Sequence, residues 1–168
     1  YNLSKNTVLM PSRILKNKGV IEFLEASKKL FLKGYNWQYI LIGANDYINP
    51  SSVNKSFLEK FNNKYNIKIY DYQKDLIPFF SKAGIVCLPS HREGMPKSIL
   101  EGLASGIPVV TTNTIGCKES IIPQVNGELA NVNDPIDLAD KLEKLMKDDD
   151  KRLKYSFEAR KYAIKHYN

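Results

Sequence analysis

Short apolar runs alternate along the chain with longer segments in which apolar residues recur at helical spacing. Six runs predict β-strands, at residues 7–11, 37–43, 67–70, 85–88, 108–111 and 127–130. The strands read as continuous apolar runs and not as alternating ones. This pattern is typical of parallel strands whose two faces are both covered by helices.

The segments between these runs predict the helices of the same fold. They lie at residues 18–33, 51–65, 76–83, 96–105, 135–147 and 151–166. Gly34 is a typical C-terminal stop, and Asp75 is a candidate helix cap. The alternation of strand and helix predicts an α/β, Rossmann-like, doubly wound parallel sheet of about six strands. Ligands bind such sheets at the carboxyl ends of the strands, so the loops after the first, fourth and fifth strands are the candidate site.

Composition limits the class of protein. The 168 residues suit one domain, and no apolar run is long enough for a membrane helix. We expect no basic-plus-apolar leader of the signal-peptide type. Cys87 lies in an apolar run and Cys117 in a glycine-containing loop. These settings predict free thiols in a reducing cytosol, not a disulfide framework.

The net charge is +7, with lysines spread over the predicted helices. Two interpretations stay open, which are solvated helix faces and an anionic partner such as a substrate or a lipid headgroup. No nucleic-acid recognition motif is present, so we expect no nucleic-acid partner. The chain has two histidines without clustered spacing, so we expect no metal site.

The loop after the first strand combines two cations with a helix start. Arg13 and Lys18 flank the turn, and Gly19 lies where the helix begins. Free N–H groups at a helix N-terminus favour anions, so this loop is a candidate phosphate or diphosphate site. The alternative is two solvated charges. The loop contains neither a Walker sequence nor a G-x-G-x-x-G fingerprint.

The loop after the fourth strand reads HREGMPKSILEG. Pro96 suits the first turn of a helix, and Gly94 permits close backbone approach. Four backbone N–H groups would then face a ligand, at Gly94, Met95, Lys97 and Ser98. Glu93, just above them, offers a carboxylate that accepts paired hydrogen bonds from sugar hydroxyls.

Two further glutamates stand out. Glu101 lies in a mostly apolar helix, where a carboxylate must be paired or solvated. A ligand with vicinal hydroxyls such as ribose is one interpretation, and a simply exposed side chain is the other. After the fifth strand, Gly116 breaks the chain and Glu119 follows in a helical turn, where it either complements the helix dipole or contributes to the site.

Taken together, RILKNKG, PSHREGMPKSILEGLASGIPVVTT and GCKE resemble the C-terminal half of retaining glycosyltransferases of family four, the glycosyl transferases group 1. The signature of that family is two glutamates separated by seven residues, then a helix of small residues and G-x-P-V-V. Here these are Glu93, Glu101 and residues 106–110. The resemblance covers nearly the whole chain and implies the C-terminal half of a GT-B fold.

The resemblance also implies roles for the matching positions. Arg13 and Lys18 would bind the nucleotide diphosphate, Glu93 the hydroxyls of the donor sugar and Glu101 those of the ribose. The loop over sugar and phosphates would be formed by Gly94, Met95, Pro96, Lys97 and Ser98. The base would lie near Tyr70, Asp71 and Tyr72. Where the family often has two adjacent glycines after the fifth strand, this chain has Ile115-Gly116-Cys117, which weakens the assignment of Gly116 and Glu119.

The implied reaction is sugar transfer from a nucleotide-diphospho-sugar with retained anomeric configuration, catalysed mainly by electrostatic stabilisation of the leaving group by Arg13 and Lys18, without cofactor or metal. REGMPKSILEG followed by GCKE is similar to bacterial transferases that build capsule, O-antigen or lipid-linked oligosaccharides. This similarity favours a UDP-hexose or UDP-N-acetylhexosamine donor and a glycan or polyprenyl-linked acceptor. The expected location is cytoplasmic, with peripheral association at the inner face of the membrane.

The half of the family that binds the acceptor has no counterpart in these residues. We therefore expect residues 1–168 to be a donor-binding domain from a longer enzyme, partnered by an N-terminal domain, which alone binds nucleotide sugar and transfers little. Two alternatives stay open. One is a UDP-sugar epimerase of the two-Rossmann type, and the other is a non-catalytic nucleotide-sugar-binding module.

Overall fold

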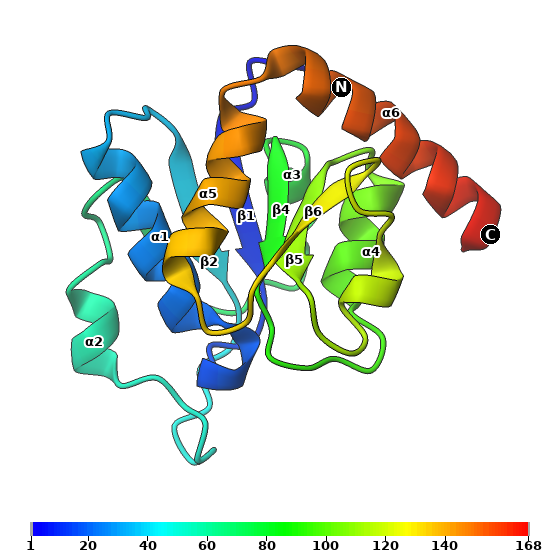
Figure 1. Cartoon of the computed structure of the whole chain (residues 1–168). Coiled ribbons are helices and arrows are strands. Elements are labelled where there is room, and N and C mark those ends of the chain that lie inside the picture. The colour runs from blue at the N-terminus through cyan, green and yellow to red at the C-terminus, as the bar shows by residue number, and fades with distance from the viewer. Residues whose placement is uncertain (1, 168) are drawn as a thin grey trace.

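The computed structural model describes residues 2–167 and contains a six-stranded sheet with helices on both faces (Figure 1). The strands are β1 (Thr7–Pro11), β2 (Gln38–Ile42), β3 (Ile67–Tyr70), β4 (Ile85–Leu88), β5 (Val109–Thr112) and β6 (Gly127–Ala130). Every neighbouring pair is parallel, in the order β3-β2-β1-β4-β5-β6. The Rossmann-like fold predicted from the apolar runs is therefore confirmed.

The helices cover the sheet in two layers. They are α1 (Val20–Leu32), α2 (Lys55–Glu59), α3 (Ile77–Phe80), α4 (Lys97–Ala104), α5 (Pro135–Met146) and α6 (Asp149–His166), with 3-10 turns η1 (Lys16–Lys18) and η2 (Lys118–Ser120). Helices α1 and α5 pack side by side on one face, and α4 packs against α6 (Figure 1). From β1 the chain continues to β2 on one side of the sheet centre, and from β4 it continues to β5 on the other side. Because both crossovers have the same hand, α1 and α4 lie on opposite faces.

This topology creates a switch point between β1 and β4, which are hydrogen-bonded neighbours. The loops leaving the carboxyl ends of these two strands turn to opposite faces of the sheet, and a crevice opens between them. The strands beneath are fully buried, with Val8, Leu9 and Met10 in β1 and Val86 in β4 inaccessible to solvent. A rigid apolar floor therefore positions the two loops.

The helix expected at residues 51–65 is wrong in length, because α2 ends at Glu59. Phe57, Phe61 and Tyr65 recur at helical spacing, but they form a tilted aromatic cluster with ring centroids 5.1 Å and 6.4 Å apart. The segment leaves the helical region at Asn63, Tyr65 and Asn66, whose φ angles lie between 55° and 60°. Asparagine tolerates this left-handed conformation, so the chain turns back into β3.

Other boundaries move by smaller amounts. The helix expected at residues 18–33 is divided by Gly19, which has φ 81° and separates η1 from α1. Helix α6 begins two residues earlier than expected because the Asp148 side chain accepts a hydrogen bond from the Lys151 N–H at 2.9 Å. The expected role of Gly34 matches the structure, whereas Asp75 lies one residue before Leu76, the N-cap residue of α3. Gly34 follows α1 with φ 97°, and the Asp75 carboxylate accepts from the Ile77 N–H at 2.9 Å.

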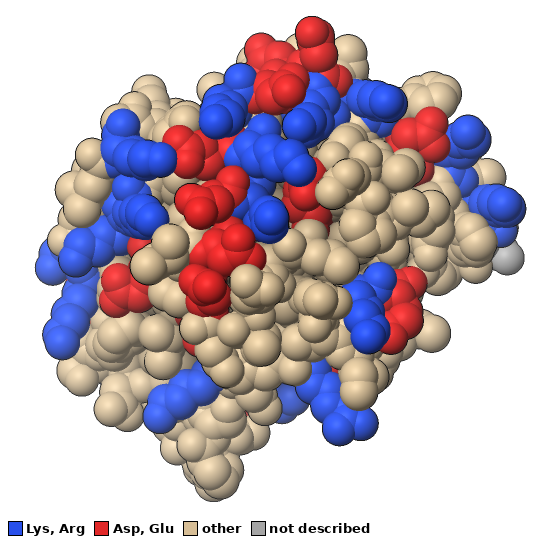
Figure 2. Space-filling view, in the orientation of Figure 1, with Lys and Arg blue, Asp and Glu red and all other residues tan. Residues whose placement is uncertain are grey.

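The surface and the thiols also fit the sequence pattern. Figure 2 shows Lys and Arg side chains scattered over the visible face with Asp and Glu among them, not gathered into one basic surface. Cys87 and Cys117 are both buried free thiols. Among residues 2–167, no helix is both long enough and apolar enough to cross a bilayer.

Candidate functional site

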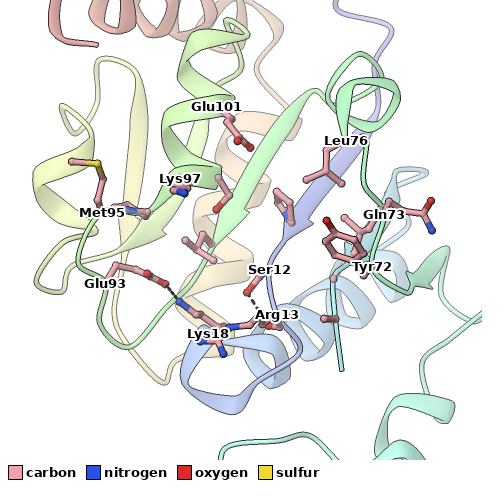
Figure 3. A pocket seen from close by; sticks show the side chains of 17 residues that line it. Ser12, Arg13, Lys18, Tyr72, Gln73, Leu76, Glu93, Met95, Lys97 and Glu101 are labelled. Carbon is pink, nitrogen blue, oxygen red and sulfur yellow. Dashed lines mark hydrogen bonds and ion pairs between the residues drawn. The ribbon is translucent and has the colours of Figure 1, made fainter. Parts of the chain in front are cut away.

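A cavity of about 520 Å³ opens at the switch point, at the carboxyl ends of the central strands (Figure 3). The loops after β1, β2, β3 and β4 and the first turns of α4 line it. Most of the residues selected from the sequence lie on its wall, namely Arg13, Lys18, Tyr72, Glu93, Met95, Pro96, Lys97, Ser98 and Glu101. Residues from positions almost 90 apart in sequence are thus gathered by the β1–β4 pairing.

Two glycines allow the loop after β1 to pack tightly against its neighbours. A β-carbon on Gly43 would lie 1.8 Å from the carbonyl oxygen of Ser12, and one on Gly19 would lie 2.1 Å from that of Pro89. The Ile14 N–H also donates to the Ala44 carbonyl at 2.9 Å. The loop that carries Arg13 and Lys18 is therefore fixed on two sides, against the loops after β2 and β4.

Glu93 is held by two donors that meet on one of its oxygens. The Lys18 ammonium lies 2.6 Å from Oε1, and the Ser90 hydroxyl donates to the same oxygen at 2.7 Å. Lys18 and Glu93 are 75 positions apart in sequence and come from the two sides of the switch point. The structure thus joins the first-loop cation and the fourth-loop carboxylate in one cluster.

Unlike Lys18 and Glu93, the side chains of Arg13 and Glu101 have no partner in the described part of the chain. Within residues 2–167, neither the Arg13 guanidinium nor the Glu101 carboxylate has a hydrogen bond or an ion pair. Figure 3 shows Glu101 projecting from α4 at one end of the cavity, with Arg13 and Lys18 at the other end. An unpaired carboxylate and an unpaired cation therefore face the same space from opposite ends.

The start of α4 adds unpaired donors between these ends. Pro96 is the N-cap residue, with φ −78°. In the described part of the chain, four backbone N–H groups of this turn have no hydrogen-bond acceptor, those of Gly94, Met95, Lys97 and Ser98. The last three residues line the cavity, whereas Gly94 is not on its wall. These donors and the positive end of the helix dipole favour an anion in the cavity.

Of the three residues expected near the base, only Tyr72 lies on the wall of the cavity. Tyr72 lines the cavity, together with Gln73 and Leu76. Tyr70 is not on this wall, and its ring packs edge-on against Phe79 with centroids 5.2 Å apart. Asp71 is also off the wall, and its carboxylate is 3.5 Å from the Asn45 amide.

Gly116 and Glu119 line a second cavity of about 840 Å³ on the other side of the Glu93 loop. Lys18, Glu93 and the Met95–Pro96 turn belong to the walls of both cavities. The Glu119 carboxylate accepts from the Gly116 N–H at 2.7 Å, so it closes its own turn. The two residues therefore sit behind the Glu93 loop and not on the wall of the first cavity.

Several residues of the site were not predicted from the sequence, including Gln73 and Leu76 in the loop after β3. Ser12 and Gly43 line the first cavity, and the fully buried Ser90 donates to Glu93. Gly43 carries a detectable signal, since a glycine directly after an apolar strand permits close backbone approach. Ser12 and Ser90 carry none, because serine is common in any loop. No group of three or more His, Cys, Asp or Glu side chains arranged to hold a metal ion occurs within residues 2–167.

Comparison with known proteins identifies close relatives in sequence. The family described as glycosyl transferases group 1 matches residues 2–162. The capsular polysaccharide biosynthesis glycosyltransferase CapM of Staphylococcus aureus is 30% identical over 140 residues, which are 83% of this chain and 36% of CapM. The N,N'-diacetylbacillosaminyl-diphospho-undecaprenol alpha-1,3-N-acetylgalactosaminyltransferase of Campylobacter jejuni is 32% identical over 96% of this chain and 41% of that protein. The chain thus spans less than half the length of these relatives.

Solved structures share the fold. The C-terminal domain of the group 1 glycosyl transferase LpcC from Francisella tularensis has a TM-score of 0.83 and 27% identity, covering 96% of this chain and 86% of that one. Anabaena HepE, solved with UDP and glucose, has a TM-score of 0.84 at 19% identity, covering 99% of this chain and 46% of HepE. On the family match and these relatives, the chain belongs to the glycosyl transferases group 1 family.

Proposed function

We propose that this chain is the donor-binding half of a retaining glycosyltransferase, and that its cavity binds a nucleotide-diphospho-sugar. The observation that carries the proposal is the arrangement of unpaired groups along the cavity. Glu101 lies at one end, and Arg13 lies near the Lys18–Glu93 pair at the other end. The free N–H groups of Met95, Lys97 and Ser98 lie between them. A nucleotide sugar presents hydroxyls, anionic oxygens and hydroxyls in that same order.

Each part of the donor meets matching chemistry. The Glu101 carboxylate accepts hydrogen bonds from the two ribose hydroxyls. The diphosphate takes the N–H groups at the start of α4 and the cations Arg13 and Lys18, because charge-assisted hydrogen bonds to anionic oxygens are short and strong. The donor sugar then lies at Glu93, and the base lies toward Tyr72 and Gln73.

The same groups support the chemistry. Transfer breaks the bond between the anomeric carbon and the diphosphate oxygen, and the electron pair stays with the diphosphate. A bond to the acceptor oxygen forms on the same face, and the proton of that hydroxyl passes to the departing diphosphate oxygen. Negative charge grows on the leaving oxygen, so Arg13, Lys18 and the free N–H groups stabilise the transition state more than the ground state. No side-chain base is required for this stabilisation.

The substrate class is proposed from relatives. HepE, which shares the fold, was solved with UDP and glucose, so UDP is the first nucleotide to test. The names of CapM and of the Campylobacter enzyme refer to capsular polysaccharide and to a diphospho-undecaprenol acceptor. We propose a UDP-hexose or UDP-N-acetylhexosamine donor and a glycan or polyprenyl-linked acceptor in bacterial surface polysaccharide synthesis, at the inner face of the cytoplasmic membrane.

The length of the relatives supports the proposal that donor and acceptor are bound by different domains. The chain covers 36% and 41% of the two relatives above, so we propose that an N-terminal domain binds the acceptor. The isolated chain then binds donor without appreciable transfer. A non-catalytic binding module is the second candidate, because binding alone uses the same cavity. Acceptor-dependent turnover by the longer enzyme separates the two.

Calorimetric titration tests the proposal. The chain is titrated with UDP, GDP and ADP, and then with UDP-glucose and UDP-N-acetylglucosamine. We expect Glu101→Ala to weaken the preferred nucleotide about 10-fold, since hydrogen bonds to a charged group contribute roughly 1.5–3 kcal/mol. Glu59→Ala is the matched control, because Glu59 is an exposed helical glutamate outside the cavity. Equal affinities in wild type and Glu101→Ala would contradict the assignment of the ribose site.

A further inference from the structure

The Ser90 hydroxyl is fully buried beneath the proposed donor-sugar site. Its oxygen lies 2.7 Å from Oε1 of Glu93, 3.1 Å from the Asn17 carbonyl and 3.2 Å from the Arg92 carbonyl. A serine hydroxyl has one proton, and the carboxylate is both the shortest contact and the only anionic acceptor of the three. The proton therefore goes to Glu93.

The position of Ser90 is itself determined by the sheet. Its carbonyl oxygen accepts hydrogen bonds from the hydroxyls of Thr112, at the end of β5, and Thr114. The residue directly follows the β4 strand and Pro89. The sheet thus fixes the place from which the hydroxyl meets Glu93 in the following loop.

The two oxygens of Glu93 differ in their surroundings. Oε1 accepts from both Ser90 and Lys18, at 2.7 Å and 2.6 Å, which occupies its two lone pairs. Among residues 2–167, Oε2 accepts no hydrogen bond. It is also not one of the polar atoms that are both buried from solvent and without a hydrogen-bond partner. Glu93 also lines both cavities, so Oε2 is the oxygen that remains available to a ligand.

We infer that Ser90 is a positioning residue that holds Oε1 of Glu93 so that Oε2 faces the donor sugar. This inference rests on the proposed function. Elsewhere in this protein an ammonium takes both oxygens of its carboxylate, because the Lys33 ammonium donates to Oε1 and Oε2 of Glu143 at 2.9 Å and 2.8 Å. The buried hydroxyl opposes a rotation of Glu93 into that arrangement, because turning would leave Ser90 without its anionic acceptor. Glu93 therefore stays available to the sugar while Lys18 stays available to the diphosphate.

The test compares two serine variants that make the same chemical change. Ser90→Ala removes the hydroxyl beneath Glu93. Ser27→Ala is the control, because Ser27 is equally buried and its hydroxyl donates at 2.7 Å to the Phe23 carbonyl, inside α1. Both variants lose one buried hydrogen bond, so any general effect on stability appears in both. Only Ser90→Ala is expected to change recognition of the sugar.

The first readout is the ratio of the dissociation constant for UDP to that for the tightest of UDP-glucose, UDP-galactose and UDP-N-acetylglucosamine. We expect Ser90→Ala to lower this ratio about 5-fold while the affinity for UDP changes less than about 2-fold, and Ser27→Ala to leave both unchanged. If Ser90 acts through Glu93, adding Glu93→Gln to Ser90→Ala lowers the ratio no further than Glu93→Gln alone. An unchanged ratio in Ser90→Ala, or additive losses, would overturn the inference.

The second readout does not depend on the sugar. In a crystal structure of Ser90→Ala we expect the Lys18 ammonium to donate hydrogen bonds to both Glu93 oxygens, where it donates only to Oε1 with Ser90 present. An unchanged carboxylate orientation would overturn the inference while leaving the proposed function intact. Failure of the wild-type chain to bind any nucleotide would instead overturn the proposed function, and the inference with it.

Discussion

Gly116 lies so close to Glu93 that a β-carbon added to Gly116 would be 1.9 Å from the Glu93 carbonyl oxygen. The Glu93 N–H also donates to the Ile115 carbonyl at 3.1 Å. The loop after β5 therefore supports the backbone of Glu93 from behind, while Lys18 and Ser90 hold its side chain. Gly116 contributes by lacking a side chain and by adopting φ 84°, a conformation that glycine adopts without strain.

Gly116→Ala should therefore displace the Glu93 loop in addition to straining its own backbone. Gly34→Ala is the matched control, because Gly34 has φ 97° but no heavy atom within 4 Å of an added β-carbon. We expect Gly34→Ala to lower the free energy of unfolding by about 1–2 kcal/mol through backbone strain alone. Gly116→Ala should cost more and should also weaken binding of the UDP-sugar relative to UDP. Equal effects of the two substitutions in urea unfolding and calorimetry would contradict a steric role for Gly116.

Arg13 offers a second prediction about the cavity. Its guanidinium is exposed and unpaired within the described residues, so its attraction for a diphosphate should weaken as salt screens the charge. We expect Arg13→Ala to reduce UDP affinity about 10-fold at low ionic strength and less at high ionic strength, with uridine binding unchanged. Lys60→Ala, an exposed cation outside the cavity, should change neither. A loss of uridine affinity as large as that of UDP would contradict the diphosphate role.

The buried Arg152 ties α5, α6 and the N-terminal segment together. Its guanidinium donates to the carbonyls of Leu145 and Met146 at 2.8 Å and 3.2 Å, and to that of Leu3 at 3.2 Å. It also lies 5.0 Å from the centre of the Trp37 ring. The side chain is 1% exposed and its hydrogen bonds to Leu145 and Met146 are buried, so these two carbonyls have little access to water as a substitute donor.

Arg152→Met keeps much of the volume and removes the donors. We expect it to lower the free energy of unfolding by about 3 kcal/mol, because buried carbonyls at the end of α5 lose their partner. Arg160→Met is the control, since the exposed Arg160 also donates to a helix carbonyl, that of Ala104, but on the surface. Its cost should stay below about 1 kcal/mol. Urea unfolding at neutral pH measures both, and similar losses would show that the burial of Arg152 is unimportant.

Glu143 predicts a pH dependence of stability. The Lys33 ammonium and the Tyr35 hydroxyl donate to its carboxylate at 2.8 Å and 2.7 Å, and these hydrogen bonds lower the pKa of Glu143. A carboxyl whose folded pKa lies below its unfolded value stabilises the fold above the unfolded pKa of about 4.3. That stability disappears as the pH falls through the folded value.

The corresponding experiment compares wild type with Glu143→Gln. We expect the variant to unfold more easily at pH 7 and the difference to shrink below about pH 4, where the wild-type carboxylate becomes protonated. Glu59→Gln, at an exposed site without a partner among the described residues, should show a small difference that changes little with pH. A constant gap between Glu143→Gln and wild type from pH 7 to pH 3 would contradict the role of this carboxylate.

The two thiols should be inert in the folded protein. Cys87 and Cys117 are fully buried, and burial raises the pKa of the Cys87 thiol because the thiolate is poorly solvated. We expect neither to react with a thiol reagent at pH 8 on the timescale of minutes, and both to react in urea. Rapid labelling of one thiol in the native chain would show that its surroundings open readily.

Much of the fold followed from local patterns. Continuous apolar runs predicted all six strands, because a parallel strand covered on both faces needs apolar residues at successive positions. The same reasoning failed at residues 51–65, where Phe57, Phe61 and Tyr65 show helical spacing without a continuous helix. Spacing reports which side chains cluster, and an aromatic cluster over turns produces the same spacing as a helix face.

Part of the candidate site was likewise predicted from the sequence, and part became visible only in the tertiary structure. The motifs in the loops after the first and fourth strands, together with the family that they resemble, were enough to select Arg13, Lys18, Glu93 and Glu101, and all four line the first cavity. Only the tertiary structure revealed that Ser90 holds Glu93 and that Gly116 supports it from behind. These contacts depend on β4 lying between β1 and β5, which brings three loops from distant parts of the chain within hydrogen-bonding range. Sequence periodicity describes one segment at a time and contains no information about which strands become neighbours.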